Sequence, residues 1–370
     1  METALPQPAT APWTTQYDPE RIARAKMPYA IRRVPRKDMA TLLTGSVRPR
    51  AGNLVLARVE KLGQHSHLEL ASGRRARLFV GDEIVLSYGN RYAPDQFEAI
   101  VPDSLAACHM VAAGGIASMT LSRHGKMSSP TMINPIGLLG DKSGSALNLA
   151  NYTLDTIASC DNDRPFTIAV AGASMNAGKT ETATSLIKGL VRSGIKVGAA
   201  KITGTAAGGD VWSMVDAGAE PVLDFSDTGF PSTYLLSAAQ VETAMITIMR
   251  HLCAAGVNAV VLEIADGLFQ QETAELLRSP VFTERVDAVV FAAKDALSAV
   301  AGVEWLRRHH LPIVAVSGIL TSSPLAIREA QTAIGLPVLD PETLGSVGSA
   351  ALMGITLHTD GRSCGAQHCA

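Results

Sequence analysis

The sequence lacks an excess of charge, a rich aromatic content and long apolar runs. The formal net charge is -2, charged residues make up 18% and aromatic residues 5%. This balance argues against a nucleic-acid or membrane-surface footprint, and no apolar run approaches the length of a membrane span. The first residues, METALPQPATAPW, lack the basic segment and apolar core of a secretory signal. We therefore expect a cytoplasmic protein without a membrane partner.

Cysteine is also scarce, and its distribution is irregular. The chain has five cysteines, an odd number, scattered over the sequence. They are Cys108, Cys160, Cys253, Cys364 and Cys369. This pattern favours free thiols in a reducing compartment over a disulfide framework.

What the sequence does contain is enough apolar material for two domains. It has 370 residues, of which 47% are hydrophobic, and such a chain can bury more than one core. Changes in composition and pattern predict five parts. These are an N-terminal arm (1–43), a small β-barrel-like domain (44–105), a connector (106–160), a nucleotide-binding domain (161–350) and a C-terminal tail (351–370).

The barrel-like domain is predicted from five short, alternating apolar runs separated by glycine-bearing turns. The runs are 54–59, 67–70, 76–80, 83–88 and 97–101. Five short strands in about sixty residues are typical of a small barrel. Arginines 74, 75, 77 and 91 lie beside acids and without interleaved aromatic residues, so a nucleic-acid partner is not expected. The connector is rich in small residues, and its segment 134–141 indicates turns.

The stretch from Phe166 to Leu190 organises the second half of the chain. Phe166 to Ala171 is a short apolar run typical of a buried strand. A loop with the pattern G-x5-G-K-T follows, from Gly172 to Thr180, and apolar residues at helical spacing come next. Strand, glycine-bearing loop and helix form a phosphate-binding arrangement, in which loop N–H groups and the helix N-terminus bind the anion. Lys179 adds a cation, and Thr180 adds a hydroxyl for Mg²⁺.

Strands and helices alternate after this loop, which predicts a doubly wound parallel sheet. Further strands are expected at 196–200, 257–263, 287–292, 313–317 and, as a short edge strand, 336–339. A helix is expected at about 238–254. The strands are almost continuously apolar, as in a sheet covered on both faces. The ligand site of such an α/β fold lies at the carboxyl ends of its strands.

The long loop spacing resembles the phosphate loop of dethiobiotin synthetases and of the related MinD-like and cofactor-assembly P-loop NTPases. The resemblance covers about residues 166–339 and implies that ATP and Mg²⁺ are bound. The residues that it implies for nucleotide binding are Gly172, Ser174, Met175, Asn176, Ala177, Gly178, Lys179, Thr180, Glu181, Ser317 and Gly318. No Asn-Lys-x-Asp motif that would select guanine follows the fifth strand.

Three residues near strand ends complete the predicted site. Glu263 ends an apolar strand, which is the Walker B arrangement that holds Mg²⁺. Lys201 matches a lysine of the dethiobiotin synthetases that contacts substrate and phosphates, and Asp210 resembles a second carboxylate on the metal side. We therefore expect Thr180, Asp210 and Glu263 at the metal, and Lys179, Lys201 and Glu263 in catalysis. The polar loop 224–234 is expected to contact substrate or a second subunit of a homodimer.

Three functions fit these features. The first is an ATP- and Mg²⁺-dependent ligase or kinase that transfers a phosphoryl group to a small acid or amine. The second is an amino-acid N-acyltransferase that uses the same loop for the pyrophosphate of coenzyme A, as a related P-loop family does. The third is a regulatory or cofactor-assembly NTPase with a protein partner.

Overall fold

The computed structural model describes residues 13–16, 19–157 and 164–355, which form two compact units. The first unit comprises residues 1–153 with the short segments 205–208 and 229–232. The second comprises the remaining segments from 154 onward. Within the described ranges, no helix is both long enough and apolar enough to cross a lipid bilayer.

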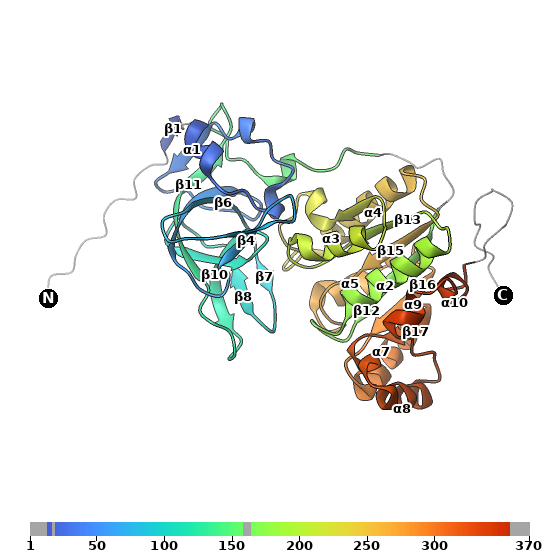
Figure 1. The fold of residues 1–370 in the computed structure, drawn as a ribbon. Coiled ribbons are helices and arrows are strands. Elements are labelled where there is room, and N and C mark those ends of the chain that lie inside the picture. Colours follow the sequence, from blue (N-terminus) through green and yellow to red (C-terminus); the bar gives the residue numbers. More distant parts are fainter. Residues whose placement is uncertain (1–12, 17–18, 158–163, 356–370) are drawn as a thin grey trace. The chain divides into compact units, whose positions relative to one another are not determined.

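The first unit is built around a closed β-barrel (Figure 1). Each strand of the ring pairs with the next, and the last strand pairs with the first. In ring order the strands are β3 (Leu54–Lys61), β6 (Glu83–Tyr88), β10 (Ile116–Arg123), β9 (Cys108–Ala112) and β11 (Thr131–Gly140). All ring neighbours are antiparallel except β6 and β10, which are parallel.

Buried side chains from every ring strand share one apolar cluster. They include Val55, Leu86, Met110, Ala117 and Ile133. The opposite face of β3 is buried as well, since its alternate residues belong to a second cluster with the first helix. Burial on both faces explains why β3 is apolar at consecutive positions.

The remaining elements of this unit extend or flank the barrel. In the same sheet are β1 (Trp13–Gln16), β2 (Thr41–Thr44), β7 (Arg91–Tyr92) and β8 (Phe97–Ile100). A separate two-stranded sheet contains β4 (His67–Glu69) and β5 (Arg75–Arg77). The helical segments are α1 (Pro19–Arg24), η1 (Tyr29–Ile31), η2 (Arg36–Asp38) and η3 (Leu149–Asn151).

The barrel-like domain expected from the sequence is confirmed, but its strands are not the five expected ones. Only β3 and β6 of those five belong to the ring, and the interval 106–160, expected as a connector, supplies the other three. Residues 134–141 were expected as turns, yet most of them lie in β11. The strand tolerates its proline because the register with β3 shifts between Pro135 and Gly137.

The expected N-terminal arm is also partly folded into this unit. Ile22 of α1 is 3% exposed and belongs to the second apolar cluster. Strand β2 pairs with β11, so residues 41–44 belong to the sheet and not to an arm. Residues 1–12, and the tail expected at 351–370 beyond residue 355, lie outside the described residues.

The second unit contains a six-stranded parallel sheet. Its spatial order is β14 (Val222–Asp224), β13 (Val197–Lys201), β15 (Ala259–Glu263), β12 (Phe166–Gly172), β16 (Ala288–Ala292) and β17 (Ile313–Ser317). The central strand β12 directs Ile168 and Val170 to one face, and Ala169 and Ala171 to the other. All four side chains are at most 1% exposed. The doubly wound parallel sheet predicted from the sequence is therefore confirmed.

Helices cover both faces of this sheet (Figure 1). One apolar cluster includes residues of α4 (Ala238–Ala254), α5 (Gln271–Arg278), α6 (Pro280–Thr283), α7 (Ala296–Arg308) and α8 (Pro324–Ile334). The other includes residues of α2 (Lys179–Arg192), α3 (Gly208–Asp216), α9 (Pro341–Leu344) and α10 (Ser349–Leu352). Two short helical segments, η4 (Phe225–Thr228) and η5 (Ile319–Ser322), follow strand ends.

Two expectations for this unit are wrong. The edge strand expected at 336–339 is reduced to a single bridge between Val316 and Val338, and the strand that completes the other edge, β14, was not expected.

Among the cysteines that the structure describes, Cys108 is a free buried thiol, whereas Cys253 is disulfide-bonded. A single pairing of this kind depends on positions in space, which the spacing of cysteines does not reveal.

Candidate functional site

The phosphate loop joins the carboxyl end of β12 to the N-terminus of α2. Helix α2 begins at Lys179, and Gly178 precedes it with φ of 94°. A Cβ atom at Gly178 would lie 3.0 Å from the backbone of Gly318 and Ile319. Both the left-handed conformation and the close approach therefore require glycine at this position. The predicted strand, loop and helix are confirmed.

Lys179 lies within the loop and not in solvent. Its Nζ donates a hydrogen bond to the carbonyl oxygen of Ser174 at 2.9 Å, and the residue is 6% exposed. Burial lowers the pKa of the ammonium group, although the carboxylates of Glu263 and Asp266 act in the opposite direction. A largely desolvated cation at the N-terminus of a helix is suited to an anionic ligand.

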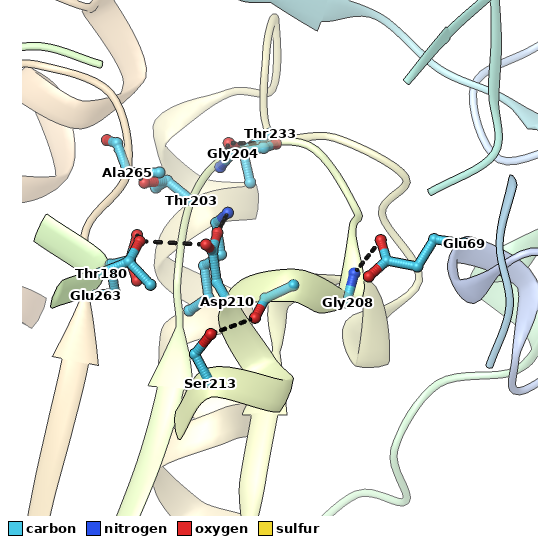
Figure 2. A network of polar contacts seen from close by, with 12 residues as sticks. Glu69, Thr180, Thr203, Gly204, Gly208, Asp210, Ser213, Thr233, Glu263 and Ala265 are labelled. Atoms are coloured by element: carbon cyan, nitrogen blue, oxygen red, sulfur yellow. Dashed lines mark hydrogen bonds and ion pairs between the residues drawn. The ribbon is translucent and has the colours of Figure 1, made fainter. Parts of the chain in front are cut away.

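The next residue of α2, Thr180, brings its hydroxyl close to two carboxylates from other elements (Figure 2). The Oγ1 of Thr180 lies 3.2 Å from Oδ1 of Asp210 and 3.2 Å from Oε1 of Glu263. Its single proton can be donated to only one of them at a time. The second oxygen of Glu263, Oε2, is buried and has no hydrogen-bond partner among the described residues. A buried carboxylate oxygen without a donor is costly, so this atom is available for a ligand.

Lys201 connects the end of β13 to this group. Its ammonium forms an ion pair with Oδ2 of Asp210, and the residue is 7% exposed. Burial alone would lower the pKa of Lys201, but the carboxylates of Asp210 and Glu263 together outweigh burial and raise it. For Asp210, burial acts to raise the pKa, while the Lys201 ammonium lowers it below the ordinary value. The two residues therefore form an oppositely charged pair in which the lysine is buried and the aspartate side chain is 30% exposed.

The pKa of Glu263 is shifted in the opposite direction from that of Asp210. Burial, and then repulsion from the Asp210 carboxylate, raise the pKa of Glu263 to about 7. The two lysines act against this rise without cancelling it. Without a further cation, the ionised form of this carboxyl is thus disfavoured relative to that of an ordinary glutamate.

The structure places the expected nucleotide-binding residues around this loop, although their roles toward a ligand stay predictions. Gly318, with φ of 99°, packs against the carbonyl oxygen of Ala177. Ser317 is fully buried at the end of β17, and its Oγ has no hydrogen-bond partner among the described residues. Glu181 points away from the loop: it is exposed and lines a groove of about 450 Å³ with Lys188 and Asp216.

Several polar residues beside the site were not selected from the sequence. Asp266 is 7% exposed, has φ of 65°, and influences the pKa of Lys179. Thr203 donates to the carbonyl oxygen of Ala265 at 3.2 Å, which joins the loops after β13 and β15 (Figure 2). Asp266 could have been selected from the sequence because it is an acid three residues after Glu263. The partners of Thr203 could not be read from the sequence.

The described part of the chain contains no group of three or more His, Cys, Asp or Glu side chains placed to hold a metal ion. The donors near the loop are one hydroxyl and two carboxylates, from Thr180, Asp210 and Glu263. Mg²⁺ is commonly bound by one or two carboxylates with substrate phosphates and waters. The donor set therefore suits a Mg²⁺ ion that arrives with a phosphate ligand more than a permanently held metal.

Comparison with solved structures gives weak similarities. The chain is 18% identical to signal recognition particle 54 kDa protein from Aeropyrum pernix K1 in complex with GDP, with a TM-score of 0.36, and the match covers 52% of this chain and 47% of that one. It is 16% identical to the signal recognition particle receptor FtsY from Elizabethkingia anophelis, with a TM-score of 0.34 and coverage of 48% and 57%. It is 17% identical to the cell division protein ftsY from Thermotoga maritima, with a TM-score of 0.35, and the match covers 55% of this chain and 74% of that one.

This chain thus spans about half the length of the first two of these proteins. No protein-family model and no curated protein matches it. The assignment therefore rests on the chain's own geometry. A parallel, doubly wound sheet with this loop between β12 and α2 defines the second unit as a P-loop nucleotide-binding fold.

Proposed function

We propose that the chain is an enzyme that transfers a phosphoryl group from a Mg²⁺-bound nucleoside triphosphate, with ATP as the expected nucleotide, to a small acid or amine. The observation that carries the proposal is the convergence of Thr180, Asp210 and Glu263 within hydrogen-bonding distance beside a buried P-loop lysine. Phosphoryl transfer needs positioning and charge stabilisation more than covalent chemistry from the protein. Residues of these types, so placed, meet that need.

The residues present fit a Mg²⁺ ion. Thr180 and Glu263 would hold the cation. The buried Oε2 of Glu263 has no hydrogen-bond donor in the described part of the chain, and a cation would satisfy it instead. Asp210 would contribute from the other side of the Thr180 hydroxyl. When bound, the ion neutralises phosphate charge that develops during transfer.

The chain's own cations have separate tasks. Lys179 already hydrogen-bonds a loop carbonyl, so it needs only to exchange Ser174 O for a phosphate oxygen. Loop amides and the N-terminus of α2 add further donors. Lys201, held by Asp210, places a second positive charge near the strand ends, where it stabilises the transferred group or orients the acceptor.

A second candidate is the acyl-CoA-dependent N-acyltransferase. The observation that favours it is the Lys201–Asp210 ion pair, because one of the two carboxylates is already neutralised without a metal ion. In that reaction the loop would bind the pyrophosphate of coenzyme A, and Glu263 would accept a proton from the amine. Acyl-CoA binding would then be independent of Mg²⁺.

Equilibrium titration of the full chain with ATP, GTP and acetyl-CoA, each with and without Mg²⁺, separates the candidates. Phosphoryl transfer predicts that a nucleoside triphosphate binds and that Mg²⁺ strengthens its binding. Lys179→Ala should weaken binding by at least tenfold, whereas Lys188→Ala, which removes an exposed lysine of the same helix, should not. Acetyl-CoA binding that ignores Mg²⁺, without triphosphate binding, would refute the first candidate and support the second.

A further inference from the structure

The helix that carries Asp210 begins at a buried carboxylate from a distant part of the chain. Oε2 of Glu69, in β4, accepts a hydrogen bond from the N–H of Gly208 at 2.9 Å, and Gly208 is the first residue of α3 (Figure 2). Glu69 is 8% exposed, and Gly208 is buried as well. The two residues are 139 positions apart, so this carboxylate is not a local cap of the helix. The proposed reaction assigns no task to Glu69.

A carboxylate at this position stabilises the start of α3. The first N–H groups of an α-helix have no partner within the helix, and a buried N–H without a partner is costly. A negative charge there also interacts favourably with the partial positive charge of the helix N-terminus. Helix α3 has only nine residues, and such short helices depend on their surroundings for stability.

The segment that leads into α3 is fixed by the same part of the chain. Residues 205–208 belong to the first unit, as Glu69 does. A Cβ atom at Gly114 would lie 1.9 Å from the carbonyl oxygen of Ala206, so the two backbones approach closely. Ala113, the neighbour of Gly114, accepts a hydrogen bond from the N–H of Glu69 at 2.8 Å. One turn of the first unit therefore contacts both the carboxylate and the segment that it caps.

Asp210 lies two residues beyond Gly208 and faces the candidate metal site. Its Oδ1 lies 3.2 Å from Oγ1 of Thr180, and its Oδ2 pairs with the ammonium of Lys201. Both contacts depend on where α3 starts, because Asp210 and Gly208 share its first turn. Glu263, by contrast, lies on a strand that is paired on both sides. Of the two carboxylates, Asp210 is the one whose position depends on a helix end.

We propose that Glu69 is a positioning residue of the Mg²⁺ site, which fixes the start of α3 and thereby holds Asp210 beside Thr180. This inference rests on the proposed function and adds to it a residue of the first unit. Glu69 acts through the backbone of Gly208, not through contact with the nucleotide or the metal. Its loss should weaken the contribution of Mg²⁺ to nucleotide binding and leave binding by the phosphate loop unchanged.

The test measures the affinity of the full chain for a non-hydrolysable ATP analogue by titration calorimetry over a range of Mg²⁺ concentrations. Glu69→Met keeps the length of the side chain but removes the acceptor of the Gly208 N–H. The Mg²⁺ concentration that gives half of the gain in affinity should rise about fivefold, as expected for one lost hydrogen bond. The affinity without Mg²⁺ should stay at the parent's value. Glu69→Gln keeps an acceptor oxygen and should behave nearly as the parent.

Both variants lack the charge of Glu69, so the difference between them isolates the hydrogen bond. Asp340→Ala is the matched control. It also removes a helix-capping carboxylate, since Oδ1 of Asp340 accepts from the N–H of Thr343 at 2.7 Å, but at α9, which carries no residue of the candidate site. It should lower the temperature of thermal unfolding and leave the Mg²⁺ dependence unchanged.

The inference is overturned if Glu69→Met leaves the Mg²⁺ dependence unchanged, or if Glu69→Gln is impaired as much as Glu69→Met. A weakened Mg²⁺ dependence in Asp340→Ala would also overturn it, because lost stability alone would then explain the effect. Failure of Glu69→Met to fold would overturn it as well, because Glu69 would then serve the fold and not the metal site. A parent chain whose nucleotide binding never depends on Mg²⁺ would refute the proposed function together with this inference. Failure of the variants alone leaves the proposed function intact.

Discussion

Glu263→Gln should make the ligand-free protein more stable at high pH while it reduces activity. In the parent, burial and the Asp210 carboxylate raise the pKa of Glu263 from 4.5 to about 7. A group whose pKa is higher in the folded than in the unfolded state contributes stability below its unfolded pKa. That contribution is lost as the pH rises through the folded pKa. The parent should therefore lose stability between about pH 4.5 and pH 7, and this loss should be complete at higher pH.

The size of this effect follows from the shift. A rise from 4.5 to about 7 corresponds to at most about 3 kcal/mol, which is the extra free energy needed to ionise the buried group. Glutamine keeps the shape of the neutral acid and cannot ionise. The variant should exceed the parent by less than about 1 kcal/mol at pH 5 and by up to about 3 kcal/mol at pH 8. Asp210 does not obscure the result, since its lowered pKa affects stability only in more acidic solution.

The assay is thermal or denaturant unfolding of parent and Glu263→Gln between pH 5 and pH 8, without and with Mg²⁺ and ATP. Without ligand, the unfolding temperatures should diverge in favour of the variant as the pH rises, by several degrees at pH 8. With Mg²⁺ and ATP, the parent should gain stability and the variant much less, because the metal lacks its carboxylate. A variant that is less stable than the parent at pH 8 without ligand would refute this account of the buried acid.

Two further substitutions test the packing and the charge pair. Gly302→Ala should destabilise the chain by about 1–3 kcal/mol, because its Cβ atom would lie 2.0 Å from the buried Phe291 ring. Gly209→Ala should be neutral or slightly stabilising, because a Cβ atom there would meet no other atom of the described residues within 4 Å. Denaturant unfolding measures the free energy of unfolding of both variants. Lys201→Met should destabilise the chain by less than the ~3–5 kcal/mol typical of breaking a fully buried pair, because Asp210 loses its cation but keeps part of its exposure to solvent. The added change Asp210→Asn should recover a large part of the loss. An equal loss in the single and double variants would show that the pair contributes only its packing.

The P-loop unit was largely predictable from the sequence because its signals are local. The helix expected at about 238–254 coincides with α4, and the strand expected at 313–317 coincides with β17. The loop between β12 and α2 has a fixed spacing that the sequence displays directly. Parallel strands buried on both faces are continuous apolar runs, and such runs are easy to locate.

For the first unit, the sequence predicted that a barrel is present but not which strands form it. Its closure depends on pairing of β9 with both β10 and β11. The ring strand β11 contains Pro135 and two glycines, so in isolation it does not look like a strand. Tertiary pairing overrides such weak local preferences. The hydrogen bond from the N–H of Leu235 to Glu272 was equally hidden, because it joins residues far apart in the chain.

Within the candidate site, residue types could be predicted but their partners could not. Lys201, Asp210 and Glu263 were selected by their places after strands, and the structure brings them together with Thr180. The sequence contains no sign that Lys201 pairs with Asp210 and leaves Glu263 with a raised pKa. That asymmetry depends on burial and distances of a few ångströms, which only the folded chain defines.

The most direct test of the central claim is the affinity of the full chain for ATP as a function of Mg²⁺ concentration at pH 8. The account predicts that Mg²⁺ strengthens binding at least tenfold in the parent and that Glu263→Gln removes most of this gain. It also predicts that Lys179→Ala weakens binding by at least tenfold with or without the metal. Lys188→Ala should behave as the parent. ATP binding that is unaffected by Lys179→Ala, or that never depends on Mg²⁺, would contradict the assignment of this loop and these carboxylates to a Mg²⁺-nucleotide.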